Sequence, residues 1–154
     1  MHLIEPKTST QTTPTVLLIH PMLSSAEGMK TVLVSNMGDD LRYLIPDLAA
    51  HGEEDATEYT SASQEAAQIH DWLLEHNITH LFLGFGASLG GVVLSELLKF
   101  NDLAFDHLFF EGTSFWTGGF LASAMEFVLK KVFLAKHCKA IADPELSVQK
   151  MEQL

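Results

Sequence analysis

Cysteine is nearly absent from this sequence of 154 residues, which contains a single one, Cys138. One thiol excludes an internal disulfide framework and a zinc site built on paired cysteines. Basic residues are also scarce: 9 lysines and arginines stand against 20 aspartates and glutamates, which gives a formal net charge of −11. So acidic a chain is a poor partner for a nucleic-acid backbone or an anionic membrane surface. The 8 histidines are scattered without the spacing of metal ligands, so no metal site is predicted.

Uninterrupted apolar segments long enough to cross a membrane are missing as well. The most apolar long segment, "GGFLASAMEFVLKKVFLA", is broken by Glu126, Lys130 and Lys131, which makes it a poor membrane span. The amino end, "MHLIEPKTST", lacks the basic start and the apolar core of a signal peptide. We therefore expect a cytoplasmic protein that needs no cofactor and acts on a small molecule.

What the sequence does have is a core and a regular alternation of elements. Hydrophobic residues make up 47% of the chain, and its length favours a single domain over residues 1–154. Short apolar runs rich in β-branched residues predict strands that are buried on both faces of a parallel sheet. These runs occupy residues 15–20, 42–48, 79–85 and 106–112.

Helical patterns separate the predicted strands. Ser24 with Glu27, and Ser61 with Gln64, have the spacing of a capping box and predict the start of a helix. Asn77 is the predicted C-cap of the second helix. The alternation predicts an α/β fold, with helices on both faces of a mostly parallel sheet in a three-layer α/β/α arrangement. In such sheets, ligands gather at the carboxyl ends of the strands.

The stretch "GFGASLGG", residues 84–91, follows the third predicted strand and precedes an apolar helical pattern. Within it, Gly86-x-Ser88-x-Gly90 matches the nucleophile-elbow pattern, in which a serine lies on a strained turn between a strand and a helix. The two flanking positions must be small because the backbones of strand and helix approach each other closely there. The N–H of Leu89, at the helix start, points the same way as the hydroxyl and can meet a developing oxyanion.

Four segments, in this order, resemble the α/β-hydrolase superfamily: "VLLIHPM", "YLIPDLAAHGEE", "LFLGFGASLGG" and "DHLFFEG". The resemblance covers roughly residues 15–112, the expected core sheet and its helices. It implies a serine esterase, lipase or thioesterase whose nucleophile is Ser88 and whose substrate has an acyl or other hydrophobic part. The oxyanion donors that it implies are the N–H groups of Leu89 and Met22, and the catalytic acid is Glu111.

This sequence departs from the pattern of the superfamily in the oxyanion loop and in the histidines that follow Ser88. Pro21 stands where the family usually has glycine, and proline has no N–H to donate. The resemblance gives His20 a role in shaping the oxyanion loop, not that of a base. After the elbow only His107 and His137 remain, the first predicted at the wrong end of a strand and the second at a helix C-terminus, so structural roles are expected for both.

The carboxyl-terminal part, residues 113–154, resembles the helical lid that the family inserts after the last matched strand. An apolar helix is predicted from about Leu121 to Lys136, and Asp143 with Pro144 predicts the start of another. We expect this sequence to be truncated before the acid and the histidine that end the family's pattern. The alternative is a naturally short protein whose final helices cover the sheet.

Two other functions fit some of the same residues. "GFGASLG" also reads as a loose G-x-G-x-x-x-G fingerprint of a Rossmann-type nucleotide-binding module, with Glu111 about twenty residues later as the ribose-binding acid. A non-catalytic relative would instead bind a ligand or a partner, and its unfinished sheet edge would allow self-association. The reason for this alternative is that no histidine after Ser88 is expected to act as the catalytic base.

Overall fold

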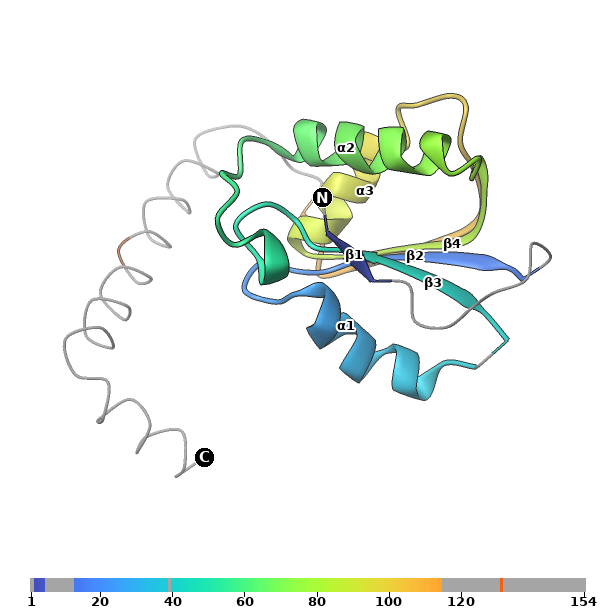
Figure 1. Ribbon diagram of the computed structural model, residues 1–154, viewed down its shortest axis with the longest axis horizontal. Helices are drawn as coiled ribbons and strands as arrows, with labels where there is room; N and C mark the ends of the chain where they lie inside the picture. The colour runs from blue at the N-terminus through green and yellow to red at the C-terminus, as the bar shows by residue number, and fades with distance from the viewer. Residues whose placement is uncertain (1, 5–12, 39, 115–130, 132–154) are drawn as a thin grey trace. The chain divides into compact units, whose positions relative to one another are not determined.

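The computed structural model describes residues 2–4, 13–38, 40–114 and 131. Strands and helices alternate along the described chain (Figure 1). The strands are β1 (Leu3–Ile4), β2 (Thr15–Ile19), β3 (Arg42–Pro46), β4 (His80–Ala87) and β5 (Ala104–Glu111). The α-helices are α1 (Ala26–Val32), α2 (Ala62–Glu75) and α3 (Leu89–Leu97), with short 3-10 turns at Val34–Asn36 and Gly52–Glu54.

The strands form one sheet in the order β1-β3-β2-β4-β5. β2 pairs in parallel with both β3 and β4, and β4 pairs in parallel with β5. Only β1 is antiparallel among the strands of the described sheet. The registers of β4 place Gly86 opposite Ile19 and Ala87 opposite Glu111, so these parallel strands end at a common edge of the sheet. The prediction of a mostly parallel sheet is confirmed.

Side chains alternate between two cores, one on each face of the sheet. Leu17 and Ile19 of β2 point into a core shared with α2 and α3, while Val16 and Leu18 point into a core shared with α1. All four are fully buried, which explains why β2 reads as an unbroken apolar run. Figure 1 shows α1 on one face and α2 with α3 on the other, so the predicted three layers are present.

Local sequence signals account for the ends of α2. The Ser61 hydroxyl accepts a hydrogen bond from Gln64 N at 3.2 Å, as the predicted cap requires. At the other end, Asn77 has φ 56°, its N–H donates to Leu74 O, and Ile78 N donates to Leu73 O. These two bonds define a Schellman motif, so the C-cap is His76 and not the predicted Asn77, which is the left-handed residue that follows it.

The prediction for α1 needs correction. The cap is Ser25, whose hydroxyl accepts from Gly28 N at 3.2 Å, and not Ser24. Ser24 instead closes the preceding turn by donating its N–H to Pro21 O at 3.3 Å. The α-helix also ends at Val32, earlier than the pattern predicts, and continues as a 3-10 turn.

The two outer strands of the described sheet were not fully anticipated. The pairing of Leu3 with Pro46 and of Ile4 with Ile45, which makes β1, has no signal in the sequence because the strand has only two residues. β5 begins at Ala104, so His107 lies in mid-strand opposite Leu83 and not at the strand's start.

The prediction of a lid falls almost wholly outside the described residues. The chain divides into two compact units, Met1–Phe115 and Trp116–Leu154, and only Lys131 of the second unit is described. The predicted helix at residues 121–136, the helix start at Asp143 and the side chains of His137 and Cys138 all lie outside the described part. Within that part, no helix is long and apolar enough to span a membrane.

Candidate active site

Ser88 occupies the single residue between the end of β4 and the start of α3. Its backbone has φ 48° and ψ −109°, a combination that an L-residue rarely adopts and that persists only where surrounding structure enforces it. Its N–H donates to the carbonyl oxygen of Glu111 at 2.7 Å, which ties the turn to β5. The side chain is exposed at the carboxyl edge of the sheet. The turn thus leaves Ser88 exposed to solvent.

The two flanking glycines are required by the distance between backbones. A Cβ on Gly86 would lie 2.6 Å from Gly90 O and from Gly91 Cα, inside the first turn of α3. A Cβ on Gly90 would lie 2.6 Å from the carbonyl carbon of Ile19 and 2.7 Å from His20 O. The turn therefore closes only with glycine at both positions, and it also brings α3 against the end of β2.

Gly91, which the elbow pattern does not include, is needed for a different contact. A Cβ there would lie 2.8 Å from the Cβ of Thr113 and would overlap its hydroxyl. Thr113 follows β5, and its hydroxyl lies 3.3 Å from Glu111 O, which accepts from it. The doubled glycine at the end of "GASLGG" was the available signal for this packing.

The loop after β2 forms a tight turn at the same edge of the sheet as Ser88. The turn runs from Pro21 to Ser24, and Leu23 has φ 65°, the positive value that a type II turn has at its third residue. The side chains of Met22 and Leu23 are 58% and 69% exposed, so this edge of the site is apolar. Within the described residues, the Met22 N–H has no hydrogen-bond acceptor.

His20 is fully buried and holds the start of this loop. Its Nδ1 donates to Pro21 O at 2.8 Å and its Nε2 accepts from Leu48 N at 3.0 Å, an arrangement that fixes one neutral tautomer. Burial lowers the pKa of His20 below 6.5, against the opposing effect of the bond to Pro21, and the nearby His51 lowers it further. With both nitrogens engaged, His20 has no free position from which to take a proton.

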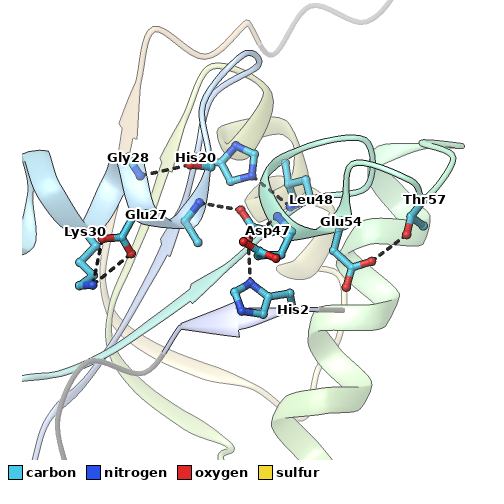
Figure 2. A network of polar contacts seen from close by, with 12 residues as sticks. His2, His20, Glu27, Gly28, Lys30, Asp47, Leu48, Glu54 and Thr57 are labelled. Atoms are coloured by element: carbon cyan, nitrogen blue, oxygen red, sulfur yellow. Dashed lines mark hydrogen bonds and ion pairs between the residues drawn. The ribbon is translucent and has the colours of Figure 1, made fainter.

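Asp47 holds the other end of the loop and is 3% exposed. Its Oδ1 accepts from Ala26 N at 2.7 Å, and its Oδ2 accepts from His2 Nδ1 at 2.8 Å and from Glu53 N at 3.3 Å. Figure 2 shows Asp47 between His2 and α1, with His20 and Leu48 beside it. Burial disfavours the ionised carboxyl, but the bonds from Ala26, His2 and Glu53 outweigh it, so the pKa of Asp47 lies below 3.8.

Asp47 is a positioning candidate that the sequence patterns did not predict. The available signal was an acidic residue directly after a buried strand. Glu65 of α2, 4% exposed, similarly accepts from Ala49 N at 3.1 Å and so holds the loop that follows β3, and no local pattern in the sequence predicts this role.

The structure places Glu111 and His107 in different surroundings. Glu111 ends β5, its carbonyl binds Ser88 N, and its exposed side chain makes no polar contact within the described residues. His107 packs edge-on against Phe82 in the middle of β5, with ring centroids 5.1 Å apart. His137 lies outside the described part. Among the described residues no group of three or more metal-ligating side chains comes together.

Comparison with known proteins identifies the fold. Neither a protein-family model nor a curated protein sequence matches the chain. A solved Desulfitobacterium hafniense protein assigned to the α/β-hydrolase family matches with a TM-score of 0.73 at 21% identity, over 87% of this chain and 53% of that one. MenH from S. aureus matches with a TM-score of 0.64 at 19% identity, over 99% of this chain and 57% of its own.

The esterase RhEst1 from Rhodococcus sp. ECU1013 matches with a TM-score of 0.62 at 20% identity, over 75% of this chain and 43% of that one. The chain thus spans about half the length of the solved proteins that it resembles. At these identities the likeness concerns the path of the backbone. The chain therefore has the α/β-hydrolase fold.

Proposed function

We propose that the chain forms the nucleophile-bearing part of a serine hydrolase acting on ester or thioester bonds. The observation that carries the proposal is the backbone of Ser88, held at φ 48° and ψ −109° between β4 and α3 with its side chain exposed. Such strain at one polar residue, enforced by two obligatory glycines, is typical of a functional site. It also disfavours the nucleotide-binding reading, which has no need of a strained serine.

In this proposal Ser88 Oγ attacks the carbonyl carbon of the substrate, and its proton passes to a base. The resulting tetrahedral oxyanion collapses, the bond to the leaving group breaks, and the leaving group takes up the proton. Water then hydrolyses the acyl–serine by the same steps in reverse, releasing the carboxylic acid. An acyl-enzyme forms and disappears in each cycle.

Met22 and Leu89 are the proposed oxyanion donors. Ile19 pairs with Gly86, so the loop that carries Met22 and the helix start that carries Leu89 leave adjacent strands at the same edge. Leu89 is the first residue of α3, and the first N–H groups of a helix have no partner inside it. Two N–H groups aimed at one oxygen would stabilise the oxyanion.

A substrate with an apolar acyl part fits the rim of the site. The side chains of Met22 and Leu23 are exposed on the loop that carries the proposed oxyanion donor. RhEst1, one of the structural neighbours, is an esterase, which supports the same class of bond. The formal charge of −11 favours a neutral substrate over an anionic one.

The reaction also needs an acid and a base. Glu111 stands at the end of β5 beside Ser88 and is the proposed acid. The base must be a histidine other than His20, whose nitrogens are engaged, and other than His107, which lies in mid-strand. Among the described residues after Ser88, no histidine is suitably placed to act as the base. This favours a second candidate, a non-catalytic relative that binds a ligand at the same edge of the sheet.

Covalent labelling separates the two candidates. We expect a fluorophosphonate probe to modify the purified chain at Ser88, the Ser88→Ala variant to stay unlabelled, and Ser63→Ala to label normally. Ser63 is a serine on α2, bonded to Glu96, and serves as the matched control. Equal labelling of wild type and Ser88→Ala would refute the assignment of the nucleophile.

Turnover of a short p-nitrophenyl ester should be slow even where labelling succeeds. Loss of triad members can remove about 10⁶ in rate, while an oxyanion hole retains roughly 10³–10⁴ over water. We therefore expect weak, Ser88-dependent hydrolysis. Rapid turnover by the chain alone would mean that a base has been overlooked, and His20, His107 and His137 would then be replaced in turn.

A further inference from the structure

The loop that carries Met22 is attached at both ends to two consecutive residues that follow β3. At its start, His20 bonds to Pro21 O and to Leu48 N. At its end, Ala26 N donates to the carboxylate of Asp47 at 2.7 Å. The position of the loop is therefore set by the end of β3 as well as by β2, from which it continues.

We infer that Asp47 is a positioning residue of this loop, and that its carboxylate joins the loop to His2 and to the turn at Glu53. The inference rests on the proposed function, because it assigns to Asp47 the task of holding the Met22 N–H toward the substrate oxygen. Asp47 itself touches no reacting atom. It acts through Ala26, four residues after Met22.

The carboxylate is surrounded by donors from three separate segments. Oδ1 accepts from Ala26 N, while Oδ2 accepts from His2 Nδ1 at 2.8 Å and from Glu53 N at 3.3 Å. Gly52, with φ 54°, allows the third segment to close over it, because a Cβ there would lie 2.6 Å from Asp47 Oδ2. A neutral or shorter side chain would leave donors from these segments without an acceptor, which is costly in a buried site.

The N-terminal segment belongs to the same arrangement. The Asp47 N–H donates to His2 O at 2.9 Å, so His2 and Asp47 are joined by two bonds, one between their backbones and one between their side chains. β1 continues this contact by pairing Leu3 with Pro46. Residues at the start of the chain thus help to hold a carboxylate that in turn holds the proposed oxyanion loop.

The turn needs such an anchor because Leu23 has φ 65°, a left-handed conformation that a leucine rarely adopts. Both Met22 and Leu23 are exposed and bury little surface to stabilise the turn. Hydrogen bonds at its two ends are then what holds it. Without the bond to Ala26 we expect the turn to relax and the Met22 N–H to lose its direction.

The test compares Asp47→Asn and Asp47→Ala with Asp106→Asn and Asp106→Ala in the whole chain. Asp106 is the matched control, an aspartate on β5 that accepts from His80 Nε2 at 2.8 Å. Hydrogen exchange of residues 20–27 reports the loop without any need for catalysis. The rate of fluorophosphonate labelling at Ser88 reports the oxyanion site.

We expect both Asp47 variants to speed exchange in residues 20–27 and to slow labelling by about 10-fold or more, toward the roughly 10²–10³ that loss of one oxyanion donor costs. Asn, which keeps one oxygen for Ala26 N, should have the smaller effect, and it carries the test if Asp47→Ala does not fold. The Asp106 variants should match wild type in both measurements. On esters the loss should appear in kcat with KM changed less than about 3-fold.

Unchanged exchange in both Asp47 variants overturns the inference, as does faster exchange with an unchanged labelling rate. Failure of the proposed function looks different, because wild type itself would then not be labelled at Ser88. In that case the inference falls with it, since there would be no oxyanion to position.

Discussion

Ser88 and its flanking glycines show how one strained residue is held in place. The serine cannot relax because its N–H is bonded to Glu111 O, and the glycines let α3 begin directly against β2 and β4. The cost of the unusual backbone, about 1–3 kcal/mol for such a residue, is offset by the packing that encloses it. A larger residue at either glycine position therefore disturbs stability and the site together.

Gly90→Ala should destabilise the fold by about 3 kcal/mol, because its Cβ would meet the backbone of Ile19 and His20, which cannot move aside. Gly38→Ala is the matched control, since the nearest atom to its Cβ is Asp40 N at 3.9 Å, and it should change stability by less than about 0.5 kcal/mol. Urea unfolding measures both. Equal stabilities of the two variants would contradict the close approach.

His20 makes the stability of the fold depend on pH near neutrality. Its pKa in the folded chain is lowered from 6.5, chiefly by burial, so below pH 6.5 the unfolded chain binds a proton that the folded chain does not. The contribution of neutral His20 to the free energy of unfolding is thus present above pH 6.5, and it is lost as the pH falls through the lower pKa of the folded state. Acidification should therefore destabilise the wild type through this residue.

His20→Gln keeps an acceptor for Leu48 N–H but does not titrate. Between about pH 7.5 and about pH 5.5, we expect the melting temperature of the wild type to fall more than that of this variant. Thermal melts followed by circular dichroism at several pH values measure the difference in melting temperature between the two proteins. The other histidines are present in both, so their effects cancel in this difference. Parallel curves would show that His20 is not held neutral.

Among the helices, α2 has ends and a buried face that both agree with its local sequence pattern. Ser61 and Asn77 determine where it begins and ends, and its buried face packs against α3 in the core that both helices share with β2 and β3. Leu73 is fully buried in this core while its neighbour Leu74 is 37% exposed. The amphipathic pattern therefore orients the helix as well as predicting it.

The neighbouring leucines allow a matched test of that orientation. Leu73→Ala should lower the free energy of unfolding by about 2–5 kcal/mol, through lost burial and the cavity left behind. Leu74→Ala should lower it by less than about 1 kcal/mol. Urea unfolding measures both variants. A larger loss of stability in Leu74→Ala than in Leu73→Ala would contradict the packing of α2.

At the scale of the whole molecule, β5 is an exposed edge strand within the described sheet. It pairs with β4 only, and Leu108 and Phe109 are 42% and 56% exposed. An eight-residue edge with apolar side chains is a template for pairing with another strand.

Self-association through β5 is therefore expected at high concentration, opposed by the net charge of −11. Phe109→Lys should shift sedimentation toward the monomer, because a lysine on an edge strand discourages strand pairing. Val32→Lys is the control: it removes an equally exposed apolar residue, 64% exposed on α1, with the same change of charge. If both variants behave alike, the association does not use this edge.

The sequence by itself determined the alternation of strands and helices, the two faces of the sheet, and the strained turn at Ser88. These features are encoded locally, because burial on one or both faces produces a periodic pattern and a close approach of backbones demands glycine at set spacing. The ends of α2 were readable for the same reason, since Ser61 and Asn77 bond to atoms within a few residues.

Only the tertiary structure decided how the site is held. His2 meets Asp47 across 45 positions of sequence, and Leu48 N meets His20 across 28. Such hydrogen bonds produce no periodic pattern in the sequence, because each one joins a single pair of groups that only the folded chain brings together. A two-residue strand such as β1 is likewise too short for a pattern, and its existence depends on β3 offering a free edge.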